Sequence, residues 1–425
     1  MRNLHAAALG QVGEYERAAA IWEGLLANYP NQPKAWMSYG HALKTLGRAD
    51  EAVAAYARAV RLQPGLGEAW WSLANMKTYR FGAEEIAQMH AQLDGELAAE
   101  DRLHFEFALG KAAEDAGNYI GAFDRYARGN ELGRAANGYN ADETTASVDR
   151  AVALFTPAFF ATRADGGNPA SDPIFVVGLP RAGSTLVEQI LASHSMVEGT
   201  MELPEMVAVA RRLGGRTKPG EVSRYPEVLG ELTPDERAEL GQEYLAATRI
   251  YRKTDRPLFI DKMPNNWAHV GLIHLILPNA KIVDARRHPM SNGFSAWKQH
   301  FARGQGFTYD LTDLGRYWRD YARAMRAIDR ALPGRVHRVI YERMVTDTEA
   351  EVRALLTYCG LPFEAACLTP HKTERAVRTP SAEQVRRPIH VGAVDEWQHY
   401  APMLHPLTAA LGNVLDAYPD VPDDF

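Results

Sequence analysis

Hydrophobic and polar positions follow two different patterns along this 425-residue chain. The first part reads as a series of helical segments, whereas after residue 172 short apolar runs alternate with longer amphipathic stretches. The four clearest runs are PIFVVG, PLFID, AKIVDA and VHRVIY. Near-continuous apolar strands separated by helices are typical of a parallel sheet that helices cover on both faces. We therefore predict an all-α domain over residues 1–165 and an α/β domain with a three-layer parallel sheet over residues 172–425. The stretch RADGGNPASDP, rich in Gly, Pro, Asp and Ser, marks the boundary between them.

The first domain repeats itself with a period of 34 residues. LGQVGEYERAAAIWEGLLANYP aligns with LKTLGRADEAVAAYARAVRLQP, and Trp36 recurs at Trp70. Small residues where helices cross and a proline that ends the second helix resemble the tetratricopeptide repeat. The match covers about residues 1–75, and LGKAAEDAGNYIGAFDRYARGNEL is a weaker echo. The first unit begins almost at Met1 without a capping helix, so we expect that the natural array can extend beyond this chain.

The first apolar run of the second domain leads into the loop GLPRAGSTL. Gly178 and Gly183 have the spacing of a phosphate-binding loop, but Ser184 replaces the lysine that follows in triphosphate-binding proteins. The glycines allow a close backbone approach, and the N–H groups at the start of the next helix attract an anion. Arg181 supplies positive charge and Thr185 a further hydroxyl. We predict an anion site here; a strand-to-helix turn that merely requires glycine is the alternative.

Charged and aromatic side chains follow the other predicted strands. Lys262 comes after PLFID, Arg287 follows AKIVDA, and Ser295 lies eight residues beyond Arg287. Tyr341 closes VHRVIY and is placed to pack on a base or to donate a hydrogen bond. Ligands of parallel sheets bind at the carboxyl ends of the strands, so these side chains are expected to converge. A solvated surface lysine and an aromatic cap on the sheet are the alternatives for Lys262 and Tyr341.

The motifs PRAGSTL, DKMP, RRHPMSNGFS, YERMV and SAEQVRRPIHVGAVDEW occur in the order found in sulfotransferases. The chain is most similar to bacterial tetratricopeptide-containing sulfotransferases, which are related to tyrosylprotein sulfotransferases. The resemblance extends over roughly Pro173 to Leu411 and implies a P-loop-like sulfotransferase fold. It also implies a donor, 3′-phosphoadenosine 5′-phosphosulfate (PAPS), whose sulfuryl group goes to a hydroxyl, and a product, 3′-phosphoadenosine 5′-phosphate (PAP). No metal is required.

The same resemblance implies roles for individual residues. It places the 5′-phosphosulfate on Arg181, Ala182, Gly183, Ser184 and Thr185, and the 3′-phosphate on Arg287 and Ser295. Lys262 contacts the bridging or sulfuryl oxygens, and Glu202 in EGTMELPEM is the proposed base, which makes Glu202, Lys262 and Arg181 the catalytic set. Tyr341, Ser381, Gln384 and Arg387 complete the donor site. Two positions depart from the family pattern, because Met201 replaces a second glutamate and His288 replaces the aspartate of the common Arg-Asp-Pro.

Composition and charge exclude several other classes of protein. A net charge of −6 argues against nucleic-acid binding. Only Cys359 and Cys367 are present, so we expect no disulfide framework and no cysteine-rich zinc site. The run VGLIHLILP is too short to span a membrane, and the N-terminus lacks the apolar core of a signal peptide. We expect a cytoplasmic protein.

Several readings stay open at this point. We interpret His194, His288, Asp261 and Asp284 as structural rather than as acid/base or magnesium-binding groups. The repeats are expected to dock a peptide or protein acceptor, to form a homodimer, or to act as a rigid neighbour. The favoured function is sulfation of a hydroxyl, with peptide tyrosine as one candidate acceptor. The alternatives are sulfation of a small molecule or saccharide, and a tetratricopeptide adaptor whose nucleotide fold is inactive. The missing loop lysine argues against a nucleotide kinase.

Overall fold

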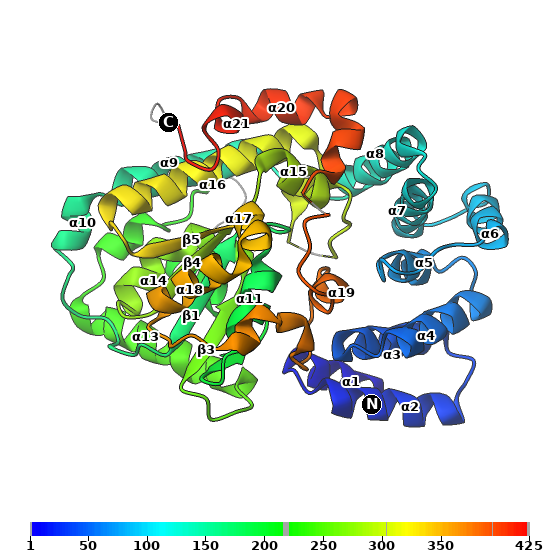
Figure 1. The fold of residues 1–425 in the computed structure, drawn as a ribbon, viewed down its shortest axis with the longest axis horizontal. Helices are drawn as coiled ribbons and strands as arrows, with labels where there is room; N and C mark the ends of the chain where they lie inside the picture. Colours follow the sequence, from blue (N-terminus) through cyan, green and yellow to red (C-terminus); the bar gives the residue numbers. More distant parts are fainter. Residues whose placement is uncertain (1, 216–220, 303, 393, 423–425) are drawn as a thin grey trace.

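The computed structural model describes residues 2–215, 221–302, 304–392 and 394–422. The last three positions of the predicted second domain, 423–425, therefore lie outside the described residues. Figure 1 shows a row of helices, coloured blue to cyan, beside a sheet that is surrounded by helices. This arrangement confirms the predicted order of an all-α part followed by an α/β part.

Ten helices form the described part of the chain before the sheet. They are α1 (Arg2–Gln11), α2 (Tyr15–Asn28), α3 (Pro33–Leu46), α4 (Ala49–Leu62), α5 (Gly67–Ala74), α6 (Ala83–Leu93), α7 (Ala99–Asp115), α8 (Tyr119–Ala135), α9 (Ala141–Leu154) and α10 (Pro157–Ala161). From α1 to α5 each helix packs on the next one, and α5 continues onto α7. The Trp36 Nε1–H donates to the carbonyl oxygen of Pro30 at 2.8 Å, and Trp70 repeats this bond to Pro64 at 2.8 Å. The same local hydrogen bond thus recurs at the predicted period.

The weaker sequence echo also folds as a repeat unit. In α3, a Cβ on Gly40 would lie 2.5 Å from the ring of Tyr56 in α4. In α7, a Cβ on Gly110 would lie 2.7 Å from the ring of Tyr126 in α8. The two Gly–Tyr pairs have the same separation along the chain, so both helix pairs use a glycine to bring a tyrosine against the first helix. Helices α7 and α8 therefore form a further unit.

The second part contains a parallel sheet of five strands in the order β2-β3-β1-β4-β5. The strands are β1 (Pro173–Gly178), β2 (Val197–Gly199), β3 (Leu258–Lys262), β4 (Lys281–Arg286) and β5 (Val336–Ile340). Four of them coincide with the predicted apolar runs to within one residue. Lys262, expected just after its strand, is instead the last residue of β3. The sequence pattern missed β2, because three residues are too few to form a run. Strand β5 ends at Ile340, so the prediction that Tyr341 closes the strand was wrong, and Tyr341 begins α17 instead.

Helices cover both faces of the sheet, as predicted. Ile174 and Val176 of β1 pack with the apolar residues of α11 and α18, whereas Phe175 and Val177 pack on the opposite side with α13, α14 and α16. This alternation buries both faces of the strand. The helices of this part are α11 (Ser184–Ala192), α12 (Glu205–Gly214), α13 (Pro234–Thr248), α14 (Val270–Ile276), α15 (Pro289–Trp297), α16 (Leu311–Ala331), α17 (Tyr341–Thr346), α18 (Thr348–Cys359), α19 (Ala382–Val385), α20 (His405–Leu411) and α21 (Val414–Ala417), with 3-10 turns η1 (Glu227–Gly230), η2 (Arg249–Tyr251), η3 (Pro264–His269), η4 (Gly306–Tyr309), η5 (Ala365–Leu368), η6 (Pro370–Lys372) and η7 (Glu396–Met403).

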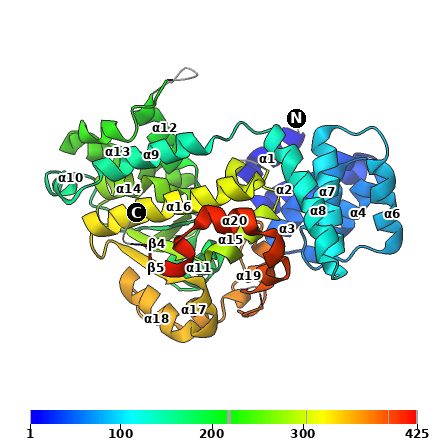
Figure 2. The same cartoon turned by 90° about the horizontal axis from the view of Figure 1, so that it is seen from above.

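Helix α9 lies along α16, although the two helices belong to different predicted domains. Figures 1 and 2 both show them side by side. The Thr145 hydroxyl of α9 donates to Asp320 Oδ2 of α16 at 2.7 Å, and Arg323 of α16 pairs with Asp149 of α9. The exact domain boundaries remain a prediction. Within the described ranges, the structure has no helix with the length and apolar character that a bilayer crossing requires.

Candidate active site

Two glycines shape the loop between β1 and α11. Gly178 has φ +134°, and a Cβ there would lie 2.3 Å from the carbonyl oxygen of Ala285 in β4. Gly183 has φ +97°, and its Cβ would lie 2.6 Å from the ring of Tyr341. Neither position accommodates a side chain. Between them Arg181 adopts φ +69°, a left-handed conformation that a non-glycine residue adopts only when its surroundings hold it there.

The side chain of Arg181 connects three other segments of the chain. Its Nε donates to Ser295 Oγ at 3.1 Å, and its Nη1 donates to Ser381 Oγ at 2.6 Å. Its Nη2 donates to Gln384 Oε1 at 3.2 Å. The structure therefore brings together side chains that the sequence separates by up to 203 positions. These contacts explain how the loop keeps its left-handed residue.

A second guanidinium lies next to Arg181. Arg287 lies over the ring of Tyr341 at 4.7 Å, and its Nη1 donates to the backbone oxygen of Arg181 at 3.5 Å. Burial, and then the positive charge of Arg287, lower the pKa of Arg181 to about 10. Two cations held this close repel each other, and an anion bound between them would relieve that repulsion. The local electrostatics thus favour a phosphate or sulfate ligand.

Eight of the predicted donor-binding residues line one cavity, namely Arg181, Gly183, Thr185, Arg287, Tyr341, Ser381, Gln384 and Arg387. Ser295 does not line it, but its hydroxyl accepts a hydrogen bond from Arg181. Ala182 is buried, and its N–H donates to the carbonyl of Leu179 at 3.2 Å inside the loop. Ala182 is therefore not brought into contact with the cavity.

The predicted base and the predicted catalytic lysine are direct neighbours. Lys262, the last residue of β3, donates from Nζ to Glu202 Oε1 at 2.5 Å. The lysine side chain is 1% exposed, whereas the glutamate side chain is 40% exposed. Burial of an ammonium group is costly unless a carboxylate or several acceptors surround it. Glu202 therefore supplies the partner for the buried cation and at the same time faces solvent.

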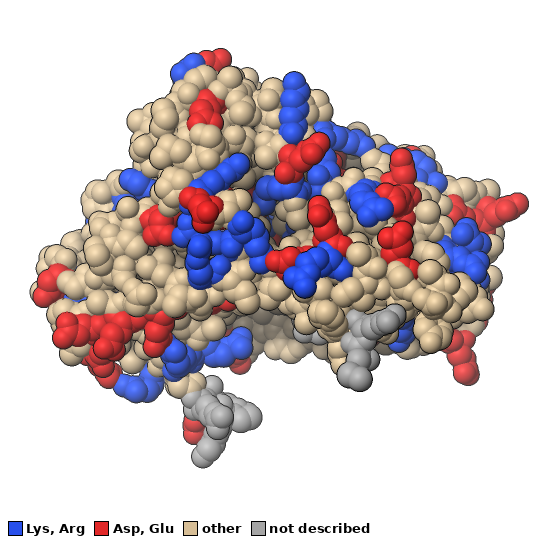
Figure 3. Space-filling model, turned by 90° about the horizontal axis from the view of Figure 1, so that it is seen from below, with Lys and Arg blue, Asp and Glu red and all other residues tan. Residues whose placement is uncertain are grey.

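A cleft of about 930 Å³ separates this loop from the repeat helices. Its α/β wall contains Pro180, Arg181, Gly183, Ser184, Thr185, Glu202 and Lys262. Its repeat wall contains Gln11, His41, Lys44, Glu68, Trp71 and His104, from the first helix of each unit (α1, α3, α5 and α7), and Asn75, which directly follows α5. Figure 3 shows this face of the molecule hollowed near its middle, with Lys and Arg side chains around the hollow. Candidate donor and catalytic residues thus face the repeats across one space.

Sequence reasoning missed every residue of the repeat wall. No motif marks them, and the available signal was only that the first helices of successive units line up on one side of the array. Glu68 lies 3.7 Å from His41 Nε2, and the rings of His104 and His300 are 4.9 Å apart. Burial lowers the pKa of His104 below its ordinary value, which disfavours a charged imidazole on this wall. The wall is therefore polar rather than uniformly basic.

The residues interpreted as structural have structural contacts. His194 is fully buried, with Nε2 3.0 Å from the carbonyl oxygen of Pro362, and His288 stacks on Trp397. Asp284 accepts from Arg286 at 3.2 Å, and burial raises the pKa of Asp261 to about 8. Among the described residues, no group of three or more His, Cys, Asp or Glu side chains is arranged to hold a metal ion.

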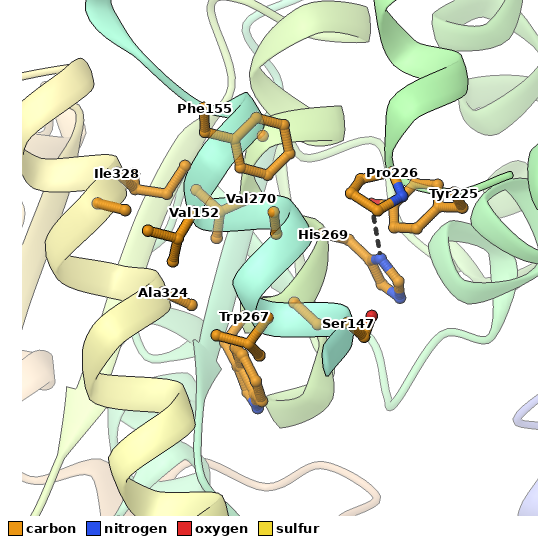
Figure 4. A pocket seen from close by; sticks show the side chains of 15 residues that line it. Ser147, Val152, Phe155, Tyr225, Pro226, Trp267, His269, Val270, Ala324 and Ile328 are labelled. Atoms are coloured by element: carbon orange, nitrogen blue, oxygen red, sulfur yellow. Dashed lines mark hydrogen bonds between the residues drawn. The ribbon is translucent and has the colours of Figure 1, made fainter. Parts of the chain in front are cut away.

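A small apolar cavity of about 120 Å³ lies away from these residues, between α9, α14 and α16. Figure 4 shows Phe155, Val152 and Ile328 on its walls and the bond between Tyr225 and His269 at one end. None of the predicted site residues lines it. We assign it no part in the candidate chemistry.

Comparisons with known proteins agree with the two-part organisation. Residues 173–365 match the sulfotransferase family and residues 3–67 match the tetratricopeptide repeat.

Similar proteins include curated relatives and solved structures. An uncharacterized protein of Aquifex aeolicus (strain VF5) is 31% identical over 382 residues, which are 87% of this chain and 49% of that protein. The chain therefore spans about half the length of this curated relative. Protein-tyrosine sulfotransferase 1 of Danio rerio is 24% identical over 271 residues, covering 56% of this chain and 71% of the relative. The solved sulfotransferase domain of the Synechococcus PCC 7002 olefin synthase is 24% identical and covers 61% of this chain and 98% of that domain, with a TM-score of 0.43. The chain therefore contains a domain of the sulfotransferase family over residues 173–365, with tetratricopeptide repeats over residues 3–67 ahead of it.

Proposed function

We propose that this protein transfers a sulfuryl group from PAPS to the hydroxyl of a tyrosine in a peptide or protein. The observation that carries the proposal is the Lys262–Glu202 pair, which lies in the same cleft as the arginine-containing loop. The family match supports sulfuryl transfer, and the similarity to a protein-tyrosine sulfotransferase supports the acceptor class.

The residues around the loop fit a donor with several negative charges. Arg181 and Arg287 repel each other in the free protein, and Gly183 leaves room for an approach to the backbone that a Cβ would close. The guanidiniums, the loop N–H groups and the hydroxyl of Ser184 would hold the phosphates and the sulfate. When bound, PAPS supplies an activated sulfuryl group joined to a phosphate leaving group. Lys262 would donate to the oxygen that gains charge as that bond breaks, and loss of such a donor typically costs about 10²–10³ in rate.

Glu202 would accept the proton of the attacking hydroxyl. A phenol has an ordinary pKa of about 10, so it stays protonated at neutral pH and must lose its proton as the new S–O bond forms. The carboxylate of Glu202 faces the cleft, and its hydrogen bond with Lys262 fixes its position. Base and charge-stabilising group are therefore adjacent before any substrate binds.

The cleft supports a peptide acceptor through its length as well as its position. Four successive first helices contribute to the repeat wall, and packed helices lie about 8–10 Å apart, so the groove is roughly 25–30 Å long. An extended peptide rises about 3.3 Å per residue, which corresponds to roughly eight residues along this wall. A single tyrosine side chain of such a peptide would reach the Lys262–Glu202 pair from the groove.

Cellular location and assembly remain proposals. Cys359 and Cys367 are both buried and free, which supports the proposed reducing, cytoplasmic compartment. A homodimer is a further proposal, which size-exclusion chromatography with light scattering would test.

Binding of PAP tests the donor assignment. The wild-type chain is expected to show a saturable rise in melting temperature with PAP and none with ATP and magnesium, while the Arg287→Ala variant shows no shift. The absence of a shift in the wild type would overturn the enzyme proposal and favour the adaptor.

A transfer assay tests the acceptor and the base. Labelled PAPS offered to tyrosine peptides, simple phenols and saccharides identifies the acceptor class. Glu202→Ala is expected to abolish transfer while PAP binding stays within about twofold.

A further inference from the structure

One segment of the sulfotransferase domain spans the distance between the repeats and the donor loop. Residues 375–387, here named the strap, contain the single-turn helix α19. Figures 1 and 2 both show α19 between α11 and the repeat helix α3. The strap therefore contacts both halves of the molecule within a few residues.

The repeat end of the strap is fixed at the C-terminal end of α3. The Val377 N–H and the Nη2 of Arg386 both donate to the backbone oxygen of Thr45, each at 3.0 Å. Arg386 also donates to the backbone oxygen of Arg375 at 3.2 Å, which closes the strap on itself. Gly47 makes room for this guanidinium, because a Cβ at that position would lie 2.6 Å from its central carbon. A turn of the repeat domain is thus shaped to seat Arg386.

The other end of the strap holds the donor loop. Ser381 and Gln384 accept two of the three side-chain hydrogen bonds of Arg181 described above. The hydroxyls of Thr379 and Thr185 are 3.3 Å apart. A small apolar cluster joins the strap to α11 through Val377, Ala382, Val385 and Leu186. Because only three of these side chains are fully buried, the strap has little core of its own and depends on its attachments at both ends.

We propose that the repeat turn at Thr45–Gly47 positions the donor-binding loop through the strap, with Arg386 as a positioning residue. The inference rests on the proposed function, because it assumes that Arg181 holds the donor. Anchoring the strap on the repeats fixes Arg181 before PAPS arrives, so donor binding does not have to order the strap. The repeat domain then contributes to donor affinity as well as to the acceptor cleft, without contacting the donor.

A matched pair of glycine variants tests the repeat side of this connection. Gly47 and Gly117 occupy equivalent helix turns with φ +82° and +74°, but a Cβ on Gly117 meets nothing within 4 Å. Gly47→Ala and Gly117→Ala therefore carry similar backbone strain, and only the first displaces Arg386. Isothermal titration of the full-length chain with PAP is expected to show about tenfold weaker binding for Gly47→Ala, the effect of roughly one net hydrogen bond, and less than a twofold change for Gly117→Ala. Equal affinities in the two variants would overturn the proposal.

A double-mutant cycle separates positioning from a direct donor contact. Arg386→Met is expected to weaken PAP binding about tenfold in the wild type, and to have little further effect when Ser381 and Gln384 are both replaced by alanine. Additive losses would show that Arg386 does not act through those two side chains, which contradicts the proposal. Arg386→Lys is expected to restore binding only in part, because lysine lacks the guanidinium fork.

Amide hydrogen exchange tests the positioning role of the strap in the absence of a donor. In Gly47→Ala, amides of residues 178–186 are expected to exchange faster than in the wild type and in Gly117→Ala. If exchange and PAP binding in Gly47→Ala are both the same as in the wild type, the positioning role of the strap is overturned and the proposed function is unaffected. Faster exchange with no PAP binding even in the wild type would overturn the donor assignment while the connection itself stands.

Discussion

Lys262 donates a hydrogen bond to Glu202 from a position that is almost fully buried, whereas the glutamate is 40% exposed. The two partners therefore depend on each other unequally. The carboxylate has water as an alternative partner, but the ammonium has no comparable access to solvent. This asymmetry has a measurable effect on stability that is separate from catalysis.

Glu202→Ala is expected to lower the free energy of unfolding by about 1–3 kcal/mol, because it leaves a buried ammonium without its carboxylate. Lys262→Met is expected to change it by less than about 1 kcal/mol, because the remaining carboxylate is hydrated and the methionine stem fills the same space. Urea denaturation with both variants measures the difference. A larger loss in Lys262→Met than in Glu202→Ala would contradict the asymmetry.

Arg181→Lys keeps a positive charge in the loop but removes the planar fork that reaches Ser295, Ser381 and Gln384. We expect PAP binding to weaken by about 10–100-fold, since one ammonium cannot satisfy three separated acceptors. Arg211→Lys, at an exposed position in the last turn of α12, is the control and is expected to bind PAP normally. Wild-type affinity in Arg181→Lys would mean that charge alone matters at this position.

Gly183→Ala is expected to destabilise the chain by about 1–3 kcal/mol more than Gly334→Ala. Both glycines have positive φ, +97° and +76°, but only the Cβ at position 183 would collide, at 2.6 Å from the ring of Tyr341. The urea midpoints of the two variants give the comparison. Equal destabilisation would show that the tyrosine ring moves aside without cost.

Asp261 makes stability depend on pH. Burial raises its pKa from 3.8 in the unfolded chain to about 8 in the folded one, although the Tyr244 hydroxyl donates to it at 2.7 Å. The folded state therefore retains a proton that the unfolded state releases, and stability falls as pH rises from about 4 to about 8, by about 1.4 kcal/mol per unit at most. Asparagine has no group that titrates, so the Asp261→Asn variant does not lose stability for this reason. Its stability relative to the wild type is expected to increase from about pH 4 to about pH 8 and to level off at higher pH. Urea denaturation at pH 5, 7 and 9 measures the trend, and parallel pH profiles would refute the assignment.

The sequence predicted those parts of the fold that have a strong pattern. Four apolar runs became strands, and the 34-residue period became helix pairs with the same tryptophan hydrogen bond. Strand β2 was missed because three residues carry no periodic signal, and Tyr341 was placed one element too early because its apolar ring continued the run of β5. Element boundaries depend on hydrogen bonds that an apolar pattern does not encode.

The site was predictable where motifs mark it and not elsewhere. Arg181, Arg287 and Lys262 could be chosen because each lies at or shortly after the end of a strand, and parallel strands bring such residues to one edge. The pairing of Lys262 with Glu202 depends on β2 lying next to β3, which a missed strand could not reveal. The repeat wall depends on how the repeat helices face the α/β part, and no local pattern in the chain records that orientation.

The packing of α9 along α16 has a practical consequence for anyone who shortens this protein. A chain that starts at the predicted boundary, near residue 172, would lose the partner of the Asp320 and Arg323 side chains and uncover apolar surface on the longest helix of the second part. Such a fragment is expected to aggregate, whether or not its active-site loop keeps its structure. Residue 141, where α9 begins, is a safer starting point than the composition of the linker suggests.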